Sequence, residues 1–292
     1  MYIAVIGITA LALLLVYGYC LNFFLKKEYY SISIPGCGKN GTVKRTKVPG
    51  SSHMEQKPVR ILLLADLHGA SFGKENGRLL SHVRETNPDL ICIAGDMTVK
   101  DGRGAKTGLA LCRELLTVCP VYYAVGNHEI QMPCYEEYCS ELRKMGVSLL
   151  DNECREHFIY GRKLVVYGWN TPRYYFHKFW QRREPPLEEL REQLGAPDEG
   201  AYRILLAHNP EYFRAYHAWG ADLVFSGHVH GGIARLPFLG GVIDPALRLF
   251  PQYDAGMYQE GSTAMVVSRG LGTHHIRLRF FNIPEISVID LQ

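Results

Sequence analysis

The sequence lacks the patterns that mark several common classes of protein. None of its eight cysteines forms a C-x-x-C pair, so a zinc ribbon or a thioredoxin-like redox motif has no support. The basic residues are scattered and the net charge is only +3, which leaves no electrostatic footprint for nucleic acid. No internal repeat of fixed period is present. A chain of 292 residues with 47% hydrophobic content is therefore expected to hold one catalytic α/β domain with accessory segments.

Charge is absent from the start of the chain, between Tyr2 and Leu25, and Lys26 and Lys27 follow at once. Such a run is long enough to cross a bilayer, which takes about 20 apolar residues. A cleaved signal peptide would begin with basic residues and have a shorter apolar stretch, and a buried core helix would be interrupted by polar residues. We therefore expect a retained transmembrane anchor over residues 1–27. The basic residues that follow it favour a single-pass protein of the cell membrane with a cytoplasmic catalytic domain.

The segment after the anchor, residues 28–58, is expected to be a strand and a linker. Ser31–Ile34 alternates as a short strand does, and the rest is rich in Gly, Ser, Lys and Thr. Three glycines between positions 36 and 41 spell G-x-G-x-x-G, but no helix pattern follows them and no acidic residue stands at the usual distance. This is not the context of a dinucleotide site. The catalytic domain is expected to span residues 59–292.

From residue 59 onward, apolar runs of strand length alternate with amphipathic stretches of helix length. This β-α-β-α rhythm predicts an α/β fold. In the first half, the expected strands are Ile61–Ala65, Leu90–Ala94 and Val121–Val125, and the expected helices are about Gly77–Thr86, Leu109–Thr117 and Tyr135–Met145. The second half is richer in expected strands: Leu164–Tyr167, Ile204–Ala207, Leu223–Phe225, Met265–Val267 and Ile276–Phe281.

Polar side chains follow five of these apolar runs, at the point where each run ends. Because the carboxyl ends of strands in an open α/β sheet converge on one crevice, residues far apart in the chain can meet there. A single D-x-H after a strand is often no more than a helix cap and a loop histidine. Five strand ends with such residues together indicate a site. The residues are Asp66 and His68, Asp96, Asn127 with His128 and Glu129, His208, and His228 with His230.

The residue types at these strand ends fit a pair of divalent metal ions. Two ions about 3.5 to 4 Å apart need a carboxylate able to bridge them, together with neutral imidazoles and oxygen ligands that suit Mn, Fe or Zn. Asp96 is the natural candidate for the bridge, and Mn is the metal we favour. Glycines beside the candidate ligands, such as Gly95, Gly126 and Gly227, would permit the close backbone approach of a crowded site.

The order D-x-H, G-D, G-N-H-E, H, G-H-x-H in this chain resembles the signature of the calcineurin-like metallophosphoesterases. The likeness covers about residue 59 to the C-terminus, and it is specific because five motifs occur in the family's order. It implies a four-layer α/β/β/α sandwich. The segments Arg235–Pro237, Ser268–Gly272 and Pro284–Ile286, with the N-terminal anchor, are similar to the bacterial membrane-associated phosphodiesterase branch of that family.

The resemblance also implies roles for individual residues. The first metal would be held by Asp66, His68, Asp96 and His230, and the second by Asp96, Asn127, His208 and His228. His128 matches the histidine that lies beside the substrate phosphate, where it would stabilise developing charge or protonate the leaving oxygen. Glu129 stands where many members have Asp, and its role is left open.

The function that follows is metal-dependent hydrolysis of a phosphoester by a hydroxide bound to two metals. The expected substrate is a phosphodiester or pyrophosphate in a lipid-linked or nucleotide-linked molecule, with chemistry like that of a UDP-diacylglucosamine hydrolase as one form. Two alternatives stay open. One is a tethered phosphatase or cyclic-nucleotide phosphodiesterase that acts on soluble substrates, and the other is a non-catalytic scaffold.

Several other residues have two interpretations at this point. His274 and His275 follow the Ser268–Gly272 loop, where a substrate contact and an ordinary loop position both fit. Arg235 and Arg269 have the chemistry to hold a phosphate, although solvated surface positions suit them better. The aromatic stretch from position 169 to 180 fits a lid, a lipid-facing patch or a piece of the core, and the core is slightly favoured.

Overall fold

The computed structural model describes residues 2–34, 57–176, 186–232, 234–273 and 277–292. Its central strands are mostly apolar because both of their faces are covered. In β2 (Val59–Leu64), Leu62 and Leu64 pack toward the outer helices, whereas Ile61 and Leu63 pack toward a second sheet. β3 (Leu90–Ala94) is likewise fully buried. The continuous apolar runs of the sequence are thus the inner strands of a layered fold.

The described strands form two mixed six-stranded sheets and one small hairpin. The first sheet has the order β1-β14-β2-β3-β4-β5 and is parallel except where β14 pairs with β2. Its remaining strands are β1 (Lys26–Ile32), β14 (Glu285–Leu291), β4 (Val121–Ala124) and β5 (Ser148–Leu149). The second sheet has the order β12-β13-β9-β8-β7-β6 and is antiparallel at both edges. Its strands are β12 (Gly256–Glu260), β13 (Thr263–Val267), β9 (Leu223–Ser226), β8 (Tyr202–Ala207), β7 (Arg162–Trp169) and β6 (Glu153–Ile159).

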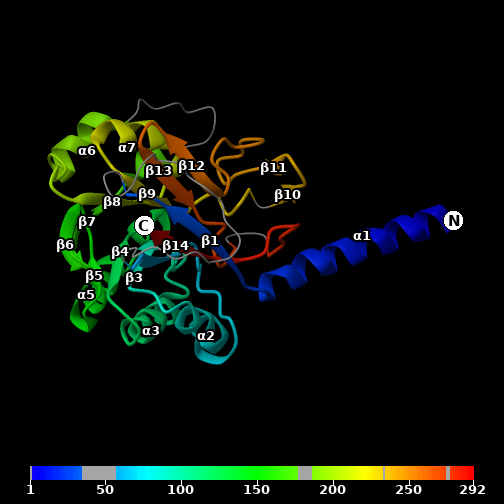
Figure 1. Cartoon of the computed structure of the whole chain (residues 1–292). Coiled ribbons are helices and arrows are strands. Elements are labelled where there is room, and N and C mark those ends of the chain that lie inside the picture. Colours follow the sequence, from blue (N-terminus) through cyan, green and yellow to red (C-terminus); the bar gives the residue numbers. More distant parts are fainter. Residues whose placement is uncertain (1, 35–56, 177–185, 233, 274–276) are drawn as a thin grey trace.

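Helices cover the outer face of each sheet, and the two inner faces pack against each other (Figure 1). The first sheet is covered by α2 (Gly77–Thr86), α3 (Ala105–Leu116) and α5 (Tyr135–Met145). The second sheet is covered by α6 (Leu187–Leu194) and α7 (Phe213–Trp219). The expected α/β fold is confirmed as two mixed sheets with flanking helices. The other elements are α4 (Asn127–Ile130), the hairpin β10 (Arg235–Leu236) and β11 (Gly240–Gly241), and 3-10 turns at Leu21–Phe23, Lys74–Asn76, Arg173–Tyr175 and Pro210–Tyr212.

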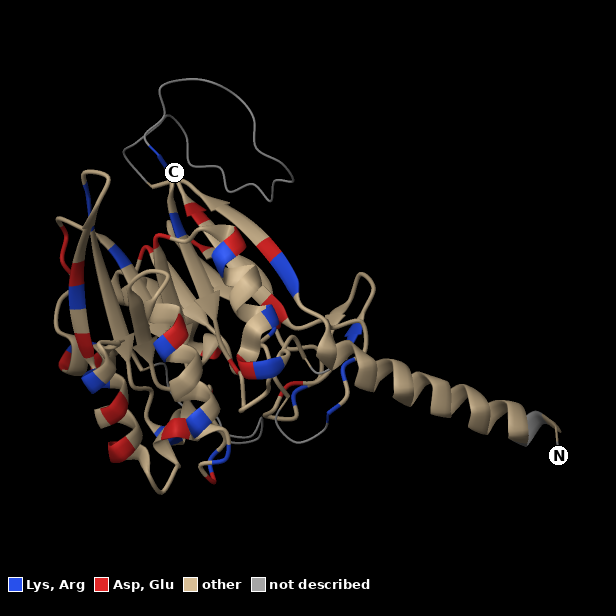
Figure 2. Ribbon diagram, turned by 90° about the horizontal axis from the view of Figure 1, so that it is seen from below, with Lys and Arg blue, Asp and Glu red and all other residues tan. Residues whose placement is uncertain are grey.

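The N-terminal helix α1 (Tyr2–Cys20) extends away from the sheets (Figure 1) and carries no charged side chain (Figure 2). Within the part of the chain that the structure describes, the span Val5–Phe23 is the one helical segment long and apolar enough to cross a membrane, and 11% of its residues are buried. These properties are shared by a membrane anchor and a signal sequence. β1 begins at Lys26, directly after this helix, and pairs with β14, so the segment after α1 is part of the first sheet.

Most of the expected elements occur at their expected positions. α2, β3 and α5 have the predicted bounds, and β2, β4, β7, β8, β9 and β13 differ from prediction by a few residues at their ends. The strand expected at Ile276–Phe281 is wrong. Among residues 277–281 the structure has only a single bridge, between Phe280 and Ala234. The strand near the C-terminus is β14 instead, which lies between β1 and β2 in the first sheet. The alternation that imitates a strand arises because Arg279 points inward to bind backbone carbonyls.

Candidate metal centre

The candidate ligands lie on the turns that leave five strands. Asp66 follows β2, Asp96 follows β3, Asn127 opens α4 after β4, and His208 and His228 follow β8 and β9. Since these strands run in parallel within their sheets, their carboxyl ends meet at one edge. The structure therefore brings together residues that are up to 164 positions apart, from Asp66 to His230.

An unusual backbone geometry is concentrated in this set. Asp66, His68, Asp96, His228 and His230 all have positive φ, between 47° and 70°. A non-glycine residue in this region costs about 1 to 3 kcal/mol and persists only where the surroundings enforce it. Backbone hydrogen bonds enforce it here, for example from the N–H of Asp66 to the carbonyl of Gly95 and from the N–H of His68 to the carbonyl of Asp96. Strain held at five residues on three turns around one point is typical of a functional site.

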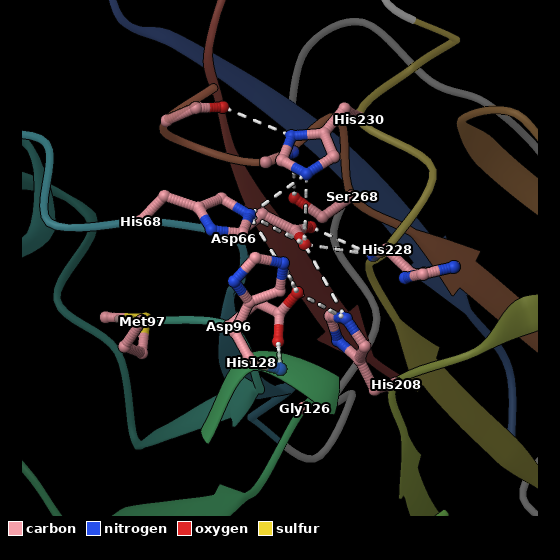
Figure 3. A network of polar contacts seen from close by, with 12 residues as sticks. Asp66, His68, Asp96, Met97, Gly126, His128, His208, His228, His230 and Ser268 are labelled. Carbon is pink, nitrogen blue, oxygen red and sulfur yellow. Dashed lines mark hydrogen bonds and ion pairs between the residues drawn. The ribbon is translucent and has the colours of Figure 1, made fainter. Parts of the chain in front are cut away.

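Ligand atoms of these residues converge within a few ångströms (Figure 3). His208 Nε2 lies 3.1 Å from Asp96 Oδ2 and 3.8 Å from Asp66 Oδ1. His230 Nε2 lies 3.6 Å from Asp66 Oδ1 and 3.1 Å from His68 Nε2. Three overlapping groups among the described residues have the spacing to hold an ion: Asp66, His68 and His230; His68, Asp96 and His128; and Asp96, His208 and His228.

Two of the histidines are oriented by backbone carbonyls. His208 Nδ1 lies 2.5 Å from the carbonyl oxygen of Ala94, and His230 Nδ1 lies 3.2 Å from that of Gly272. A carbonyl can only accept, so each Nδ1 carries the proton and donates it. The Nε2 atom of each ring then faces the carboxylates. This is the arrangement by which an outer hydrogen bond fixes the tautomer of a metal-binding histidine.

Burial and mutual charge set the protonation of the cluster. Burial raises the pKa of Asp66 to about 7, and the neighbouring carboxylate of Asp96 adds to the rise. Burial acts in the same direction on Asp96, but the charge of His208 and of other histidines holds the Asp96 pKa well below its usual value. Burial lowers the pKa of His230 to about 3 and, together with the charge of His208, holds that of His228 well below its usual value. His228 and His230 are thus neutral imidazoles, the form that binds metal.

The residues present fit a pair of divalent cations. Asn127 Oδ1 is buried and has no hydrogen-bond partner among the described residues, which is costly unless a cation satisfies it. Side chains in place of the neighbouring glycines would collide with the carboxylates: a Cβ on Gly126 would lie 2.2 Å from Asp96 Oδ1, and one on Gly227 would lie 2.5 Å from Asp66 Oδ2. The donor set of carboxylates, imidazoles and one amide oxygen suits first-row divalent metals.

His128 lies beside this cluster with its ring in a defined orientation. Its Nδ1 accepts a hydrogen bond from the backbone N–H of Lys100 at 3.0 Å. The proton of the neutral ring is therefore on Nε2, which lies 3.9 Å from Asp96 Oδ2. The His128 backbone N–H also donates to Asp96 Oδ1 at 2.8 Å. The ring can present an N–H to a group bound at the cluster.

Glu129 has a structural role that sequence reasoning left open. Its carboxylate is fully buried and accepts from the backbone N–H groups of Asp96, Met97, Thr98 and Gly126 at 2.7 to 3.1 Å. It also accepts from the hydroxyl of Tyr123 at 2.9 Å. One side chain thereby fixes the turn that carries Asp96 to the turn that precedes Asn127. A glutamate directly after a strand-end G-N-H was the available signal, but its partners are distant in sequence.

Sequence reasoning missed Arg279, and it weighed Phe176 only as part of an aromatic stretch. Arg279 is buried and donates to the carbonyls of Arg269, Gly270 and Gly272. The ring of Phe176 packs edge-on against that of His228, with centroids 5.0 Å apart. The aromatic stretch before it is partly core, because Trp169 and Tyr175 are buried; the rest of that stretch, from position 177, lies outside the described residues.

Two arginines that sequence analysis weighed as phosphate ligands are held by carboxylates. Arg235 lies 3.0 Å from Asp254, and Arg269 lies 3.1 Å from Glu285. Both ion pairs are largely buried, which favours a structural role. His274 and His275 lie outside the residues that the structure describes.

Comparison with known proteins places this architecture among metallophosphoesterases. The family model described as calcineurin-like phosphoesterase matches residues 59–232. The uncharacterised metallophosphoesterase YkuE of Bacillus subtilis is 42% identical over 36% of this chain and 39% of its own length. The phosphodiesterase YaeI of Escherichia coli is 27% identical over 80% of this chain and 82% of its own. A zebrafish transmembrane protein with a metallophosphoesterase domain is 27% identical over 80% of this chain and 53% of its own.

Proposed function

Because the chain belongs to the calcineurin-like phosphoesterase family and is a hydrolase of the dimetal type, we propose that it is a membrane-tethered phosphodiesterase or pyrophosphatase. Its substrate would be lipid-linked or nucleotide-linked. The observation that carries the proposal is the meeting of Asp66, Asp96 and four histidines around one point, with positive φ at both aspartates and at three of the histidines. The likeness to the phosphodiesterase YaeI supports a diester substrate. We place the chain in the bacterial membrane-associated phosphodiesterase branch of the family.

The ligand sets are assigned from the grouping of the side chains. Asp66, His68 and His230 form one group, and Asp96, His208 and His228 form another. Asp96 would belong to both sites, because its Oδ2 lies 3.9 Å from His68 Nε2 and 3.1 Å from His208 Nε2. Asn127 would complete the second site with its buried amide oxygen. Mn is the ion we propose for both, with Fe or Zn as substitutes, since mixed oxygen and imidazole ligands suit all three.

When bound, two divalent cations neutralise phosphate oxygens and lower the pKa of a coordinated water. The residues of this chain supply the rest. The tautomer of His128 places an Nε2–H at the cluster, where it would stabilise the negative charge that develops on the phosphate or donate its proton to the leaving oxygen. The hydrogen bond from Lys100 holds the ring in this tautomer. A histidine suits this task because its pKa lies near neutrality.

Tethering by α1 completes the proposal. We take the apolar helical segment before β1 as the anchor and residues 59–292 as the catalytic domain, at the cytoplasmic face of the cell membrane. β1 (Lys26–Ile32) adds to the first sheet of that domain, so the expected boundary at residue 27 shifts to the start of this strand. The helix is apolar over the required length, and lysines follow it, as the positive-inside rule predicts for that side. The likeness to a transmembrane metallophosphoesterase supports an anchor.

The test uses the full chain in detergent with Mn and compares bis-p-nitrophenyl phosphate with p-nitrophenyl phosphate. We expect faster hydrolysis of the diester by the unchanged chain and loss of metal and activity in Asp96→Asn. We expect His128→Ala to lower turnover by about 10²- to 10⁴-fold while metal content, measured by mass spectrometry, stays near that of the unchanged chain. Faster hydrolysis of the monoester would show that the chain is a phosphatase and would refute the proposed diesterase activity. Normal metal content in Asp96→Asn, or lost metal in His128→Ala, would refute the residue roles.

A further inference from the structure

An unusual concentration of exposed apolar side chains lies on residues 234–250, which we call the apolar lobe. Phe238 is completely exposed and Leu239 is 66% exposed. Soluble surfaces rarely gather large apolar groups in this way without a partner. The other members are Leu236, Leu247, Leu249 and Phe250, each at least 43% exposed. The charged residues Asp244 and Arg248 are ion-paired with each other, and the tip between positions 236 and 243 has no charged residue.

The exposure of the apolar lobe does not arise from a loosely held chain. Arg235, at its base, donates to the carbonyl of Gly231 at 3.0 Å and forms an ion pair with Asp254. Asp254 in turn accepts from the backbone N–H of Gly241, which fixes the hairpin of β10 and β11. Arg248 pairs with Glu211 next to the second sheet. A scaffold of buried polar contacts thus presents the apolar tips outward.

The apolar lobe is continuous with the end of α1. The backbone N–H of Arg235 donates to the carbonyl of Phe280 at 2.9 Å, and Phe280 packs so closely on Gly18 that an added Cβ would lie 2.6 Å from its ring. Tyr17 and the exposed Phe281 have ring centroids 5.7 Å apart. In Figure 1 the β10–β11 hairpin and α1 lie on the same side of the sheets. If α1 were inserted in a bilayer, the lobe would therefore lie at the surface of that bilayer.

The metal centre adjoins the same lobe. His230 is followed after four residues by β10, and the turn that carries it is bonded to the lobe, because the backbone N–H of Val242 donates to the carbonyl of Gly232 at 3.3 Å. The carbonyl of His230 accepts from Asn282 at 2.7 Å, in the segment that packs on α1. A change in the position of the lobe would therefore be passed to the turn that carries His230.

We propose that the apolar lobe inserts into the headgroup and upper acyl region of the lipid bilayer beside α1, and so holds the metal centre against lipid headgroups. The proposal rests on the proposed function in one respect, that α1 is a retained anchor. A lipid bilayer is the partner of matching chemistry, because it accepts exposed Phe and Leu side chains on an uncharged tip without requiring a complementary protein surface. Insertion would also favour substrates whose phosphoester lies at the membrane surface.

The test places a tryptophan in the lobe and a matched one far from it. The full chain with Leu239→Trp is reconstituted into nanodiscs of phosphatidylcholine and phosphatidylglycerol, with or without bromine on the acyl chains. The control is Phe158→Trp, which is as exposed, at 70%, but lies on β6 at the opposite edge of the second sheet. Bromine quenches only nearby indoles. We expect the added emission of Leu239→Trp to fall at least twofold in brominated discs and that of Phe158→Trp to be unchanged.

The outcomes separate this proposal from the anchor. A chain that leaves the membrane fraction in carbonate wash would refute the retained anchor. A chain that stays in the membrane, with Leu239→Trp quenched no more than Phe158→Trp, would refute lobe insertion alone. Emission that shifts with protein concentration and is indifferent to bromine would assign the lobe to a second copy of the chain and overturn the lipid proposal.

A functional readout addresses the consequence for substrates. The double variant Phe238→Ser with Leu239→Ser is expected to hydrolyse soluble bis-p-nitrophenyl phosphate at the rate of the unchanged chain. Its hydrolysis of a phosphatidyl-p-nitrophenol presented in phosphatidylcholine vesicles is expected to fall about tenfold, because the metal centre is no longer held at the headgroups. An equal loss on both substrates would mean that the lobe supports the fold of the site, and would overturn its role in docking.

Discussion

Two buried side chains of opposite charge support the two sides of the metal centre by opposite means. Glu129 lies on the side of the first sheet and collects four backbone N–H groups. Arg279 lies in the segment between β13 and β14 and collects backbone carbonyls of the loop that follows β13. In both cases one charged group satisfies several peptide groups of turns beside the ligands. The backbone turns that these two side chains hold thus help to fix the ligands, together with contacts among the ligands such as the hydrogen bond from the N–H of His228 to Asp66.

The two charges differ in their effect on the neighbouring ligand. Burial and the negative charge of Asp96 raise the pKa of Glu129, so two anions are held close together on that side. Arg279 faces Asp66, whose pKa its positive charge lowers in opposition to burial. On the side of Glu129 the positive charge near the two carboxylates comes from histidines such as His208, whereas on the side of Arg279 it comes from a guanidinium that faces Asp66. Substitution at the two positions is expected to separate these contributions.

The largest effect is expected at Glu129. Glu129→Ala would leave four backbone N–H groups and the Tyr123 hydroxyl without an acceptor, at about 1 to 3 kcal/mol for each that water cannot reach. We expect a loss of about 3 to 5 kcal/mol in the free energy of unfolding and loss of metal with it. Denaturant unfolding and metal analysis measure the two. The exposed Glu137→Ala on α5 is the control. A change at Glu129 no larger than at Glu137 would contradict the positioning role.

Glu129→Gln sharpens the same point, because the amide keeps one acceptor oxygen and loses the charge. It also turns an NH₂ group toward backbone N–H donors. We expect it to retain the fold with a loss of about 1 to 3 kcal/mol and to bind Mn at least tenfold more weakly, since the anion beside Asp96 is gone. Equal Mn affinity in Glu129→Gln and the unchanged chain would show that Glu129 acts through hydrogen bonds alone.

A smaller effect is expected at Arg279. Arg279→Met removes the donors to Gly270 and Gly272. It also removes a buried charge whose desolvation opposes folding, and burial lowers the pKa of this arginine to about 10. We expect a loss of about 1 to 2 kcal/mol and metal binding about tenfold weaker, because Gly272 orients His230. The exposed Arg277→Met, two residues earlier, is the control. If Arg279→Met were more stable than the unchanged chain and bound metal with the same affinity, Arg279 would not support its side of the centre as Glu129 supports the other.

The sequence was sufficient to predict the parts of the site that follow from local pattern. Asp96 and His208 could be placed together because each follows an apolar run, and runs of this type end at one edge of an α/β fold. The networks of Glu129 and Arg279 could not be predicted, since their partners are peptide groups whose direction depends on φ at distant turns. Arg279 in fact misled the prediction of a strand at 276–281, because its inward guanidinium sits in an alternating apolar pattern. The apolar lobe was hidden for a related reason: Phe238 resembles a core residue until the fold shows that nothing covers it.

The smallest effect concerns a third buried charge, Glu285 on β14. Its partners are the hydroxyls of Ser287 and Tyr30 and the guanidinium of Arg269, in place of peptide groups. Burial raises its pKa above the usual value of 4.5 despite the opposing charge of Arg269. A carboxyl whose pKa is raised by folding binds its proton more tightly in the folded state, so it contributes stability below pH 4.5 that is lost as the pH rises through the folded pKa. In denaturant unfolding from about pH 4.5 to 8, the unchanged chain should therefore lose stability relative to Glu285→Gln as the pH rises. The control is the exposed Glu199→Gln, whose free energy of unfolding should change with pH as that of the unchanged chain does. If the unchanged chain instead gained stability relative to Glu285→Gln as the pH rises, the ion pair with Arg269 would outweigh the effect of burial. A buried carboxylate would then be stable in this fold without hydrogen bonds from peptide groups.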